Sequence, residues 1–154
     1  MNNTITIRRA GPADKLEWLR MRLALWPDEN AEQLRTEMDA TLADPMTPVF
    51  LAIRPDGRSG GFIEAGTRKY AEGCETSPVG FIEGWYVDPD LRKQGVGAAL
   101  VHAAEDWARG QGLTEMGSDT WLDNEASIQA HLKLGYQEME RLVHFGKRIY
   151  NARG

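Results

Sequence analysis

The residues best suited to chemistry lie between Arg92 and Gly97, where the spacing Arg-x-x-Gly-x-Gly joins a predicted strand to a predicted helix. The first backbone N–H groups of a helix have no partner within it, and the helix dipole adds partial positive charge, so an anion binds well there. Gly95 and Gly97 remove side chains where a phosphate would approach the backbone, and Arg92 and Lys93 add positive charge. We interpret this segment as a binding loop for a diphosphate. The alternative is a tight turn without a ligand.

Two predicted elements must position this loop. The strand is Val79–Val87, a run of mainly apolar residues that Pro89 ends. The helix begins at Val96 and ends near Gly110 or Gly112, because apolar residues follow Val96 at offsets of four, seven, eight and eleven and form one face. A strand, a glycine-containing loop and an amphipathic helix in this order favour a ligand-binding loop over a simple turn.

The rest of the chain predicts further strands and helices around this unit. The complete order is strand, two helices, three strands, helix, strand, helix, strand. We therefore predict an α/β fold with helices flanking a mixed sheet, which is antiparallel at the hairpins and parallel where a helix intervenes. The additional strands are predicted at Thr4–Arg8, Val49–Ile53, Gly61–Thr67, Leu113–Thr120 and Arg141–Ile149, and the additional helices after Pro12, after Asn30 and at Asn124–Leu134.

Composition narrows the class of protein. The chain has 154 residues and a formal charge of -5, so we expect one domain over residues 1–154 and no nucleic-acid partner, because binding to phosphates rewards clustered basic side chains. No apolar run approaches the roughly 18 residues that span a bilayer, and Met1–Arg9 lacks the apolar core of a signal peptide, so we expect no membrane association. The single Cys74 cannot form an internal disulfide, and no Cys or His pair has zinc-ligand spacing. We expect a cytoplasmic protein without a metal.

These motifs resemble those of the GNAT superfamily of acetyl-CoA-dependent N-acetyltransferases. Arg92, Gly95 and Gly97 match the family signature Q/R-x-x-G-x-G/A, and the segment Asn124–Tyr136 is similar to the later family segment N-x-A-x-x-x-Y-x-K-x-G-F. The resemblance implies acetyl-CoA as co-substrate and a GNAT-like α+β fold, whose mixed, mostly antiparallel sheet contains a splayed pair of parallel strands. The residues that the resemblance assigns to acetyl-CoA are Trp85, Tyr86, Val87, Arg92, Lys93, Gln94, Gly95, Val96, Gly97, Ala98 and Asn124.

One position departs from the family pattern. His131 stands where the family usually carries a tyrosine that is thought to protonate the leaving thiolate. A histidine can also donate a proton near neutral pH, which makes His131 a candidate general acid. The alternative is that His131 only packs or faces solvent.

A second resemblance concerns the substrate. Five blocks of the chain are similar to bacterial aminoglycoside 6′-N-acetyltransferases, namely 25–27, 73–79, 81–84, 115–120 and 138–141. The resemblance implies direct acetyl transfer from acetyl-CoA to the 6′-amine of a polycationic aminoglycoside, antibiotic resistance, and a homodimer. The residues that it assigns to the drug pocket are Trp26, Tyr70, Glu83, Asp119 and Glu140, with Glu83 and Asp119 as proton acceptors.

The two proposed proton acceptors suit this chemistry. Alkyl amines are mostly protonated at pH 7, so a base has to remove a proton before the amine can attack. Glu83 precedes Trp85 by two residues and should project on the same side of its strand, while Asp119 lies on the neighbouring predicted strand. The two carboxylates should therefore face one pocket. The alternative is that each is a solvated acid at the end of a strand.

An alternative also exists for the aromatic residue of the pocket. Trp26 closes the apolar stripe of the helix after Pro12, which includes Leu16, Leu19 and Leu23, and so it can be a core residue. Its flat face would equally suit a sugar ring or an ammonium group.

Two other functions remain open. The same fold can acetylate a polyamine, a small metabolite or a protein amine. It can also act as a non-catalytic acyl-CoA-binding module. Release of free thiol from acetyl-CoA in the presence of an aminoglycoside, spermidine or a lysine peptide distinguishes these functions.

Overall fold

The computed structural model describes residues 4–150, so residues 1–3 and 151–154 of the expected domain lie outside the described part. This part contains a five-stranded sheet in the order β1-β2-β3-β4-β5. Neighbouring strands are antiparallel except β4 and β5, which are parallel, as expected for a mixed, mostly antiparallel sheet. The strands are β1 (Thr6–Arg9), β2 (Val49–Ile53), β3 (Ser59–Arg68), β4 (Val79–Val87) and β5 (Met116–Ser118).

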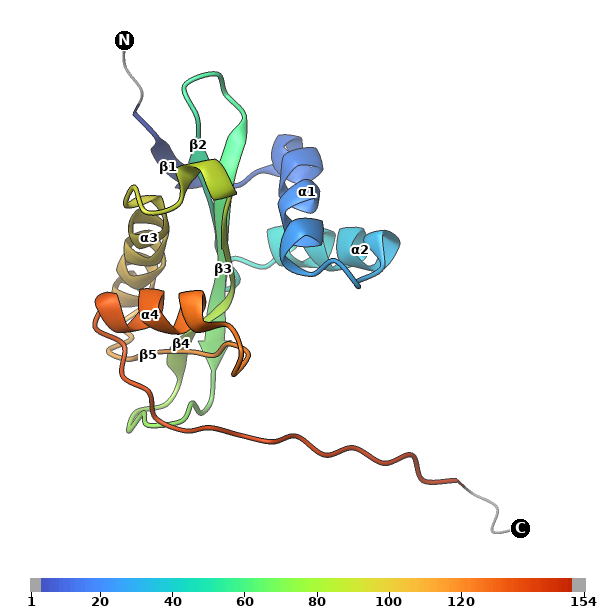
Figure 1. The fold of residues 1–154 in the computed structure, drawn as a ribbon, viewed down its shortest axis with the longest axis vertical. Helices are drawn as coiled ribbons and strands as arrows, with labels where there is room; N and C mark the ends of the chain where they lie inside the picture. Colours follow the sequence, from blue (N-terminus) through green and yellow to red (C-terminus); the bar gives the residue numbers. More distant parts are fainter. Residues whose placement is uncertain (1–3, 151–154) are drawn as a thin grey trace. The chain divides into compact units, whose positions relative to one another are not determined.

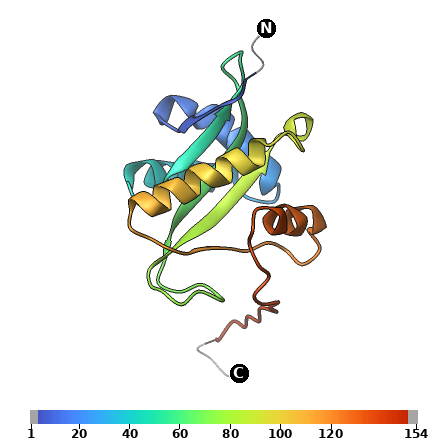
Figure 2. The same cartoon turned by 90° about the vertical axis from the view of Figure 1, so that its left-hand side faces the viewer.

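Helices cover both faces of this sheet. α1 (Lys15–Leu25) and α2 (Ala31–Ala43) lie on one face, and α3 (Val96–Gly110) lies on the other (Figures 1 and 2). The 3-10 turns η1 (Pro12–Asp14) and η2 (Pro89–Leu91) precede α1 and the loop before α3. No helix of the described residues is long and apolar enough to cross a membrane.

An apolar core fills the space between the sheet and the first two helices. Trp18 and Met21 of α1 pack with Leu34 and Met38 of α2 and with Phe62 of β3, and all five are buried. The predicted stripe of α1 is wrong at one position. Leu16 is 81% exposed, because α1 directs Trp18 and Met21 toward the sheet instead.

The chain divides into two compact units, Met1–Asp119 and Thr120–Gly154, which we describe separately. The first unit contains the sheet and helices α1 to α3. The second contains α4 (Glu125–Lys133), where Asn124 caps the helix by accepting a hydrogen bond from the Ser127 N–H at 3.1 Å. Gly135 follows the end of α4 with φ of +91°, the conformation expected of a glycine at a helix C-terminus.

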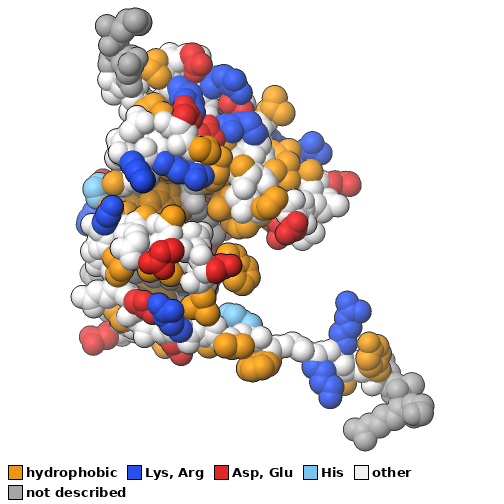
Figure 3. Space-filling model, in the orientation of Figure 1, with side chains coloured by type: hydrophobic (Ala, Val, Ile, Leu, Met, Phe, Trp, Pro, Cys, Tyr) orange, Lys and Arg blue, Asp and Glu red, His pale blue; other side chains and the backbone are white. Residues whose placement is uncertain are grey.

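The predicted strand Arg141–Ile149 is wrong, because the described residues after α4 form neither a strand nor a helix. Apolar side chains are exposed along this extended C-terminal segment, as Figure 3 shows. Among them, Phe145 is 94% exposed. A strand needs a neighbouring backbone to pair its N–H and C=O groups, and a favourable pattern of side chains does not supply one.

Two other features of the sheet differ from the prediction. β1 and β2 are antiparallel although helices intervene between them. Two helices, rather than one, connect β1 to β2, so the chain comes back to the end of the sheet where β1 ends. β2 therefore starts at that end and runs antiparallel to β1. The strand expected at Leu113–Thr120 is limited to β5, because only Met116–Ser118 pair with β4.

Candidate functional site

β4 extends beyond its parallel neighbour. β5 ends at Ser118, opposite Ile82, while β4 continues to Val87, so the two strands pair only over the first part of β4. This opening is the splayed parallel pair implied by the sequence resemblance. An opened strand edge presents backbone N–H and C=O groups with which an extended ligand can pair.

Glu83 lies at an irregularity in β4. In the pairing with β3, Glu64 lies opposite Gly84 and Ala65 lies opposite Ile82, which leaves Glu83 as an extra residue. An extra residue in one strand is a β-bulge, and it interrupts the alternation of side chains. Glu83 and Gly84 therefore both face the side of the sheet that carries α1 and α2.

The bulge separates Glu83 from Trp85. The Nε1–H of Trp85 donates a hydrogen bond to the carbonyl oxygen of Gly97 at 3.2 Å, which places the indole on the α3 side of the sheet. The prediction that Glu83 and Trp85 share one side of β4 is therefore wrong. Strict alternation holds only in a strand without a bulge.

The structure pairs Glu83 with a cation, Arg68, the last residue of β3. Nε and Nη2 of Arg68 donate to Oε1 and Oε2 of Glu83 at 3.0 and 2.8 Å, and its Cζ lies 3.6 Å from the centroid of the Phe81 ring. Hydrogen bonding to Glu83, with the charges of Glu83 and Asp119, outweighs burial and raises the pKa of Arg68. Asp119 directly follows β5, and its charge acts on the same guanidinium.

Trp26 lies beside these carboxylates on the same face of the sheet. A Cβ added to Gly84 would lie 2.8 Å from Cη2 of Trp26, so the absence of a side chain next to Glu83 admits the indole. The ring meets Phe62 edge-on, with centroids 6.3 Å apart. Trp26 is half-buried, and it is both a contact of the core and an accessible aromatic surface.

An ion pair beneath Trp26 was missed by sequence reasoning. Nε and Nη2 of Arg22 donate to Oε2 and Oε1 of Glu64 at 2.8 and 2.5 Å, and both residues are only 5% exposed. The Nε1–H of Trp18 donates to the same carboxylate at 3.2 Å, and Cζ of Arg22 lies 5.1 Å from the centroid of Trp26. The signal available in the sequence was a charged residue within each of two otherwise apolar stretches.

Tyr70, the remaining predicted pocket residue of the first unit, lies in the loop after β3. It is 63% exposed, and its hydroxyl donates a hydrogen bond to the Glu72 carboxylate at 2.9 Å. Its position two residues after Arg68 places an exposed aromatic ring in the chain segment that leaves the Glu83 site.

The loop before α3 has the features of an anion site. Gly95, the N-cap of α3, has φ of +83°, which favours glycine, and no atom of another residue lies within 4 Å of the position of an added Cβ. No side chain caps α3, and its first turn contains no acidic residue. The first N–H groups of this helix are therefore open to an external anion.

Gly97 has a packing role that the sequence did not predict. A Cβ at Gly97 would lie 3.1 Å from the indole of Trp85, so the absence of a side chain admits that ring. Lys93 also has positive φ, at 62°, which is uncommon for a residue other than glycine. The Trp85 indole packs on Gly97 and donates a hydrogen bond to its carbonyl oxygen, so Trp85 and the start of α3 stabilise each other.

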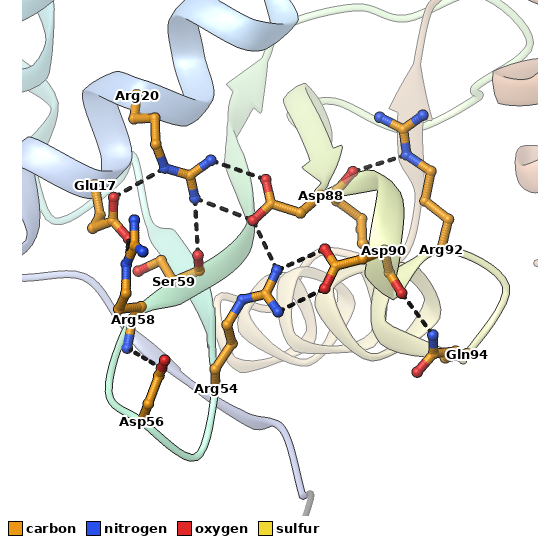
Figure 4. Close-up of polar contacts among 11 residues, drawn as sticks. Glu17, Arg20, Arg54, Asp56, Arg58, Ser59, Asp88, Asp90, Arg92 and Gln94 are labelled. Atoms are coloured by element: carbon orange, nitrogen blue, oxygen red, sulfur yellow. Dashed lines mark hydrogen bonds and ion pairs between the residues drawn. The ribbon is translucent and has the colours of Figure 1, made fainter.

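Side chains within the loop stabilise the turn that precedes it. Nε of Arg92 donates to the carbonyl oxygen of Val87 at 2.9 Å, and its outer nitrogens point away from the turn (Figure 4). Nε2 of Gln94 donates to the carbonyl oxygen of Asp90 at 2.8 Å. Arg92 also lies over Tyr86, with 5.8 Å between Cζ and the ring centroid.

Asp88 anchors the same turn to the rest of the first unit (Figure 4). Its carboxylate accepts hydrogen bonds from Arg20 of α1 at 3.0 and 3.1 Å and from Arg54, beyond β2, at 3.1 Å. Arg54 also donates to both carboxylate oxygens of Asp90 at 2.8 Å. Burial acts to raise the pKa of Asp88, but the hydrogen bonds from Arg20 and Arg54 outweigh it and lower that pKa.

The other predicted site residues belong to the second unit. The side chain of Asn124 caps α4, as described above. Nδ1 of His131 lies 2.7 Å from the carbonyl oxygen of Ser127, so this nitrogen carries a proton, and the ring meets Tyr136 edge-on at 5.8 Å. Glu140 is exposed in the C-terminal segment. Among residues 4–150, no group of His, Cys, Asp or Glu side chains is arranged to hold a metal.

Comparison with known proteins identifies the family. Residues 15–136 match the sequence profile of the acetyltransferase (GNAT) family. The chain belongs to this family. It is therefore an acetyl-CoA-dependent N-acetyltransferase with a GNAT fold, as the sequence motifs implied.

Three relatives support the assignment to GNAT. The aminoglycoside N(6′)-acetyltransferase type 1 of Klebsiella aerogenes is 44% identical over 152 residues, which cover 97% of this chain and 100% of that protein. The apo crystal structure of an aminoglycoside 6′-N-acetyltransferase from Acinetobacter haemolyticus has a TM-score of 0.87 at 40% identity and covers 94% of this chain and 99% of that one. An aminoglycoside N-acetyltransferase in complex with CoA has a TM-score of 0.91 at 33% identity, with coverages of 97% and 98%.

The residues present fit the co-substrate of GNAT enzymes. Acetyl-CoA carries a diphosphate, an extended pantetheine arm and an activated acetyl group. The open N-terminus of α3 at Gly95, with Arg92 and Lys93 nearby, matches the diphosphate, and the opened edge of β4 matches the extended arm.

Acid is expected to remove the stabilisation that Asp88 provides to this GNAT fold. Because the folded pKa of Asp88 lies below the unfolded value of about 4, its stabilisation is complete above that pH and is lost as the pH falls through the folded pKa. Asp88→Asn should lower the free energy of unfolding by about 2 kcal/mol at pH 7 and by progressively less below about pH 4. Urea denaturation across this pH range measures the difference. Asp106→Asn, at an exposed pair with Arg109, is the matched control, and an equal effect of both substitutions would contradict the expectation.

Proposed function

We propose that this enzyme transfers the acetyl group of acetyl-CoA to the 6′-amine of aminoglycoside antibiotics and thereby confers resistance. The observation that carries the proposal is the exposed carboxylate of Glu83, which holds a cation, Arg68, where the edge of β4 opens, with the charge of Asp119 acting on the same guanidinium. A polycationic substrate matches such a position. Relatives that are at least 40% identical over most of both chains carry the same activity in their names.

The proposed binding of the substrate ammonium groups depends on the negative charge of the carboxylates. Each ammonium about 4 Å from a carboxylate gains roughly 4 kcal/mol of Coulomb energy at an effective dielectric near 20, and desolvation offsets much of this gain. Trp26 and Tyr70 offer flat apolar faces to the sugar rings or ammonium groups. We assign Glu140 as a further carboxylate for the drug on the basis of the family resemblance.

The proposed chemistry is direct attack of the amine on the thioester of acetyl-CoA. Glu83 or Asp119 accepts a proton from the 6′-ammonium, directly or through water, which leaves the nitrogen lone pair available for attack. His131 is proposed to protonate the leaving thiolate. Because its Nδ1–H is bonded to the Ser127 carbonyl oxygen, His131 acts through Nε2 and has to carry both ring protons when it donates.

The acetyl-CoA side of the proposal uses the opened strand and the loop. We assign the β4 backbone to the pantetheine arm and the loop N–H groups to the diphosphate, with Asn124 assigned by resemblance. The proposed strand residues are Trp85, Tyr86 and Val87, and the proposed loop residues are Arg92, Lys93, Gln94, Gly95, Val96, Gly97 and Ala98.

We also infer that residues 1–154 act as one acetyltransferase domain, because the family match spans parts of both compact units. A cytoplasmic location is supported by Cys74, the one cysteine of the chain, which is a free thiol. The net charge of -5 supports a cationic small molecule rather than a nucleic acid as partner.

We infer a homodimer from the extended C-terminal segment. Val143, Phe145 and Ile149 are 68%, 94% and 90% exposed on an extended backbone, which favours pairing with a second copy of the chain. Sedimentation equilibrium should give twice the chain mass of 17.2 kDa. Phe145→Asp should shift the equilibrium toward the monomer, whereas a monomeric wild type would contradict the inference.

The decisive test of the function is regiochemical. Free thiol release from acetyl-CoA should occur with an aminoglycoside that carries a 6′-amine and stay at background with its matched analogue that carries a 6′-hydroxyl. Spermidine and a lysine peptide should be poor substrates. Equal turnover of both aminoglycosides would contradict the assignment of the 6′-amine, and preferred turnover of spermidine or the peptide would favour another GNAT activity. No turnover with any amine, while CoA still raises Tm, would favour an acyl-CoA-binding module.

A further inference from the structure

Arg68, the cation that pairs with Glu83, has a defined position of its own. Arg68 is held from two directions, by both oxygens of Glu83 at its edge and by the Phe81 ring at its face, 3.6 Å from Cζ. The paired fork of a guanidinium fixes the orientation of a carboxylate more strongly than a single donor does. The exposed, bulged Glu83 therefore owes its orientation to Arg68.

The same contacts place Arg68 in competition with a substrate. The side chains of Arg68 and Glu83 are 44% and 42% exposed, so an ammonium group can reach the pair from solvent. Each oxygen of Glu83 accepts one hydrogen bond from Arg68 and can accept another, so a substrate ammonium would share the carboxylate with the guanidinium and lie close to a like charge. The guanidinium also offsets part of the negative charge of Glu83 and Asp119 that attracts a polycation.

We propose that Arg68 is a positioning residue for acetyl transfer, which holds the carboxylate of Glu83 in place while the substrate ammonium binds the same carboxylate. This inference rests on the proposed function. In the proton-transfer step, the Glu83 oxygen that contacts the ammonium forms an O–H bond as the N–H bond of the ammonium breaks, and the electron pair stays on nitrogen. Arg68 keeps the carboxylate oriented during this step and remains charged.

Two substitutions separate the geometry of Arg68 from its charge. Arg68→Gln removes both the fork and the competing cation, so kcat should fall about tenfold while the Kd for tobramycin falls about threefold. Arg68→Lys keeps the charge without the fork, so kcat should fall less and Kd should stay near the wild-type value. Steady-state kinetics gives kcat, and isothermal titration calorimetry with tobramycin gives Kd. Arg109→Gln on α3 is the matched charge control and should change neither quantity.

Slower turnover together with tighter binding of tobramycin is the signature of this role. A purely structural role for Arg68 would instead lower Tm and raise the KM for acetyl-CoA, and that result would overturn the proposal. Unchanged kcat in Arg68→Gln, or weaker binding of tobramycin, would overturn it as well. Failure of the proposed function is distinguishable, because then the wild type would release no thiol with tobramycin. Should Arg68→Gln not fold, the kcat and Kd of Arg68→Lys carry the test, and unchanged kcat there would also overturn the proposal.

Discussion

Replacement of Glu83 with Gln is expected to lower kcat/KM for a 6′-amino aminoglycoside by about 100-fold. A positioned general base typically contributes about 10²- to 10⁴-fold to a rate, and a neutral amide cannot accept the proton. Asp119→Asn should act in the same direction, because the charge of Asp119 acts on the guanidinium that holds Glu83 and Asp119 is the second proposed proton acceptor. The KM for acetyl-CoA should change little in either variant, since neither carboxylate belongs to the loop at the start of α3.

The comparison needs a control for loss of one negative charge. Asp106→Asn on α3 provides it, because Asp106 is exposed and pairs only one turn away with Arg109. Its kinetics should match the wild type. If both Glu83→Gln and Asp119→Asn retain wild-type kcat/KM, neither residue accepts the proton, and the amine must lose it to water or to another group.

Loss of the Glu64 carboxylate is expected to produce the largest change in stability. Glu64→Gln removes the buried partner of Arg22 at a site where both residues are 5% exposed and leaves only the more exposed carboxylate of Glu37 at 3.3 Å, so the free energy of unfolding should fall by about 3 kcal/mol. The double variant Arg22→Met with Glu64→Leu should recover most of this loss, because an apolar pair can replace a buried ion pair. Urea denaturation of Arg22→Met, Glu64→Leu and the double variant measures the coupling, and Glu64→Gln is measured beside them.

The same pair also affects the proposed drug pocket. Arg22 lies 5.1 Å from the ring centroid of Trp26, so the stable double variant should still raise the KM for aminoglycosides through a less restrained indole. The KM for acetyl-CoA should not change. A double variant with wild-type KM for the drug would show that Trp26 is held by Phe62 and Gly84 alone. Equal stability of Glu64→Gln and wild type would contradict the buried-charge argument itself.

Periodicity located most elements of this fold because secondary structure depends on neighbours along the chain. Val79–Val87 forms β4 as predicted, α3 begins at Val96, and Asn30 caps α2 by accepting a hydrogen bond from the Gln33 N–H. The signature glycines identified the family for the same reason, since a loop conformation with positive φ at Gly95 requires that residue type locally. A strand forms only where another strand lies beside it, and the sequence pattern does not show whether one does. The predicted strand Arg141–Ile149 is wrong for this reason.

The sequence by itself therefore determined the family, the order of most elements and the loop that suits a diphosphate. Only the tertiary structure decided how the side chains around the proposed amine site are arranged. The bulge at Glu83 changes which face the carboxylate occupies, and the ion pairs Arg68–Glu83 and Arg22–Glu64 join residues that are 15 and 42 positions apart along the chain. The physical reason is that a strand register and an ion pair are chosen by packing across the sheet, and a linear pattern of residue types does not encode which distant group lies opposite.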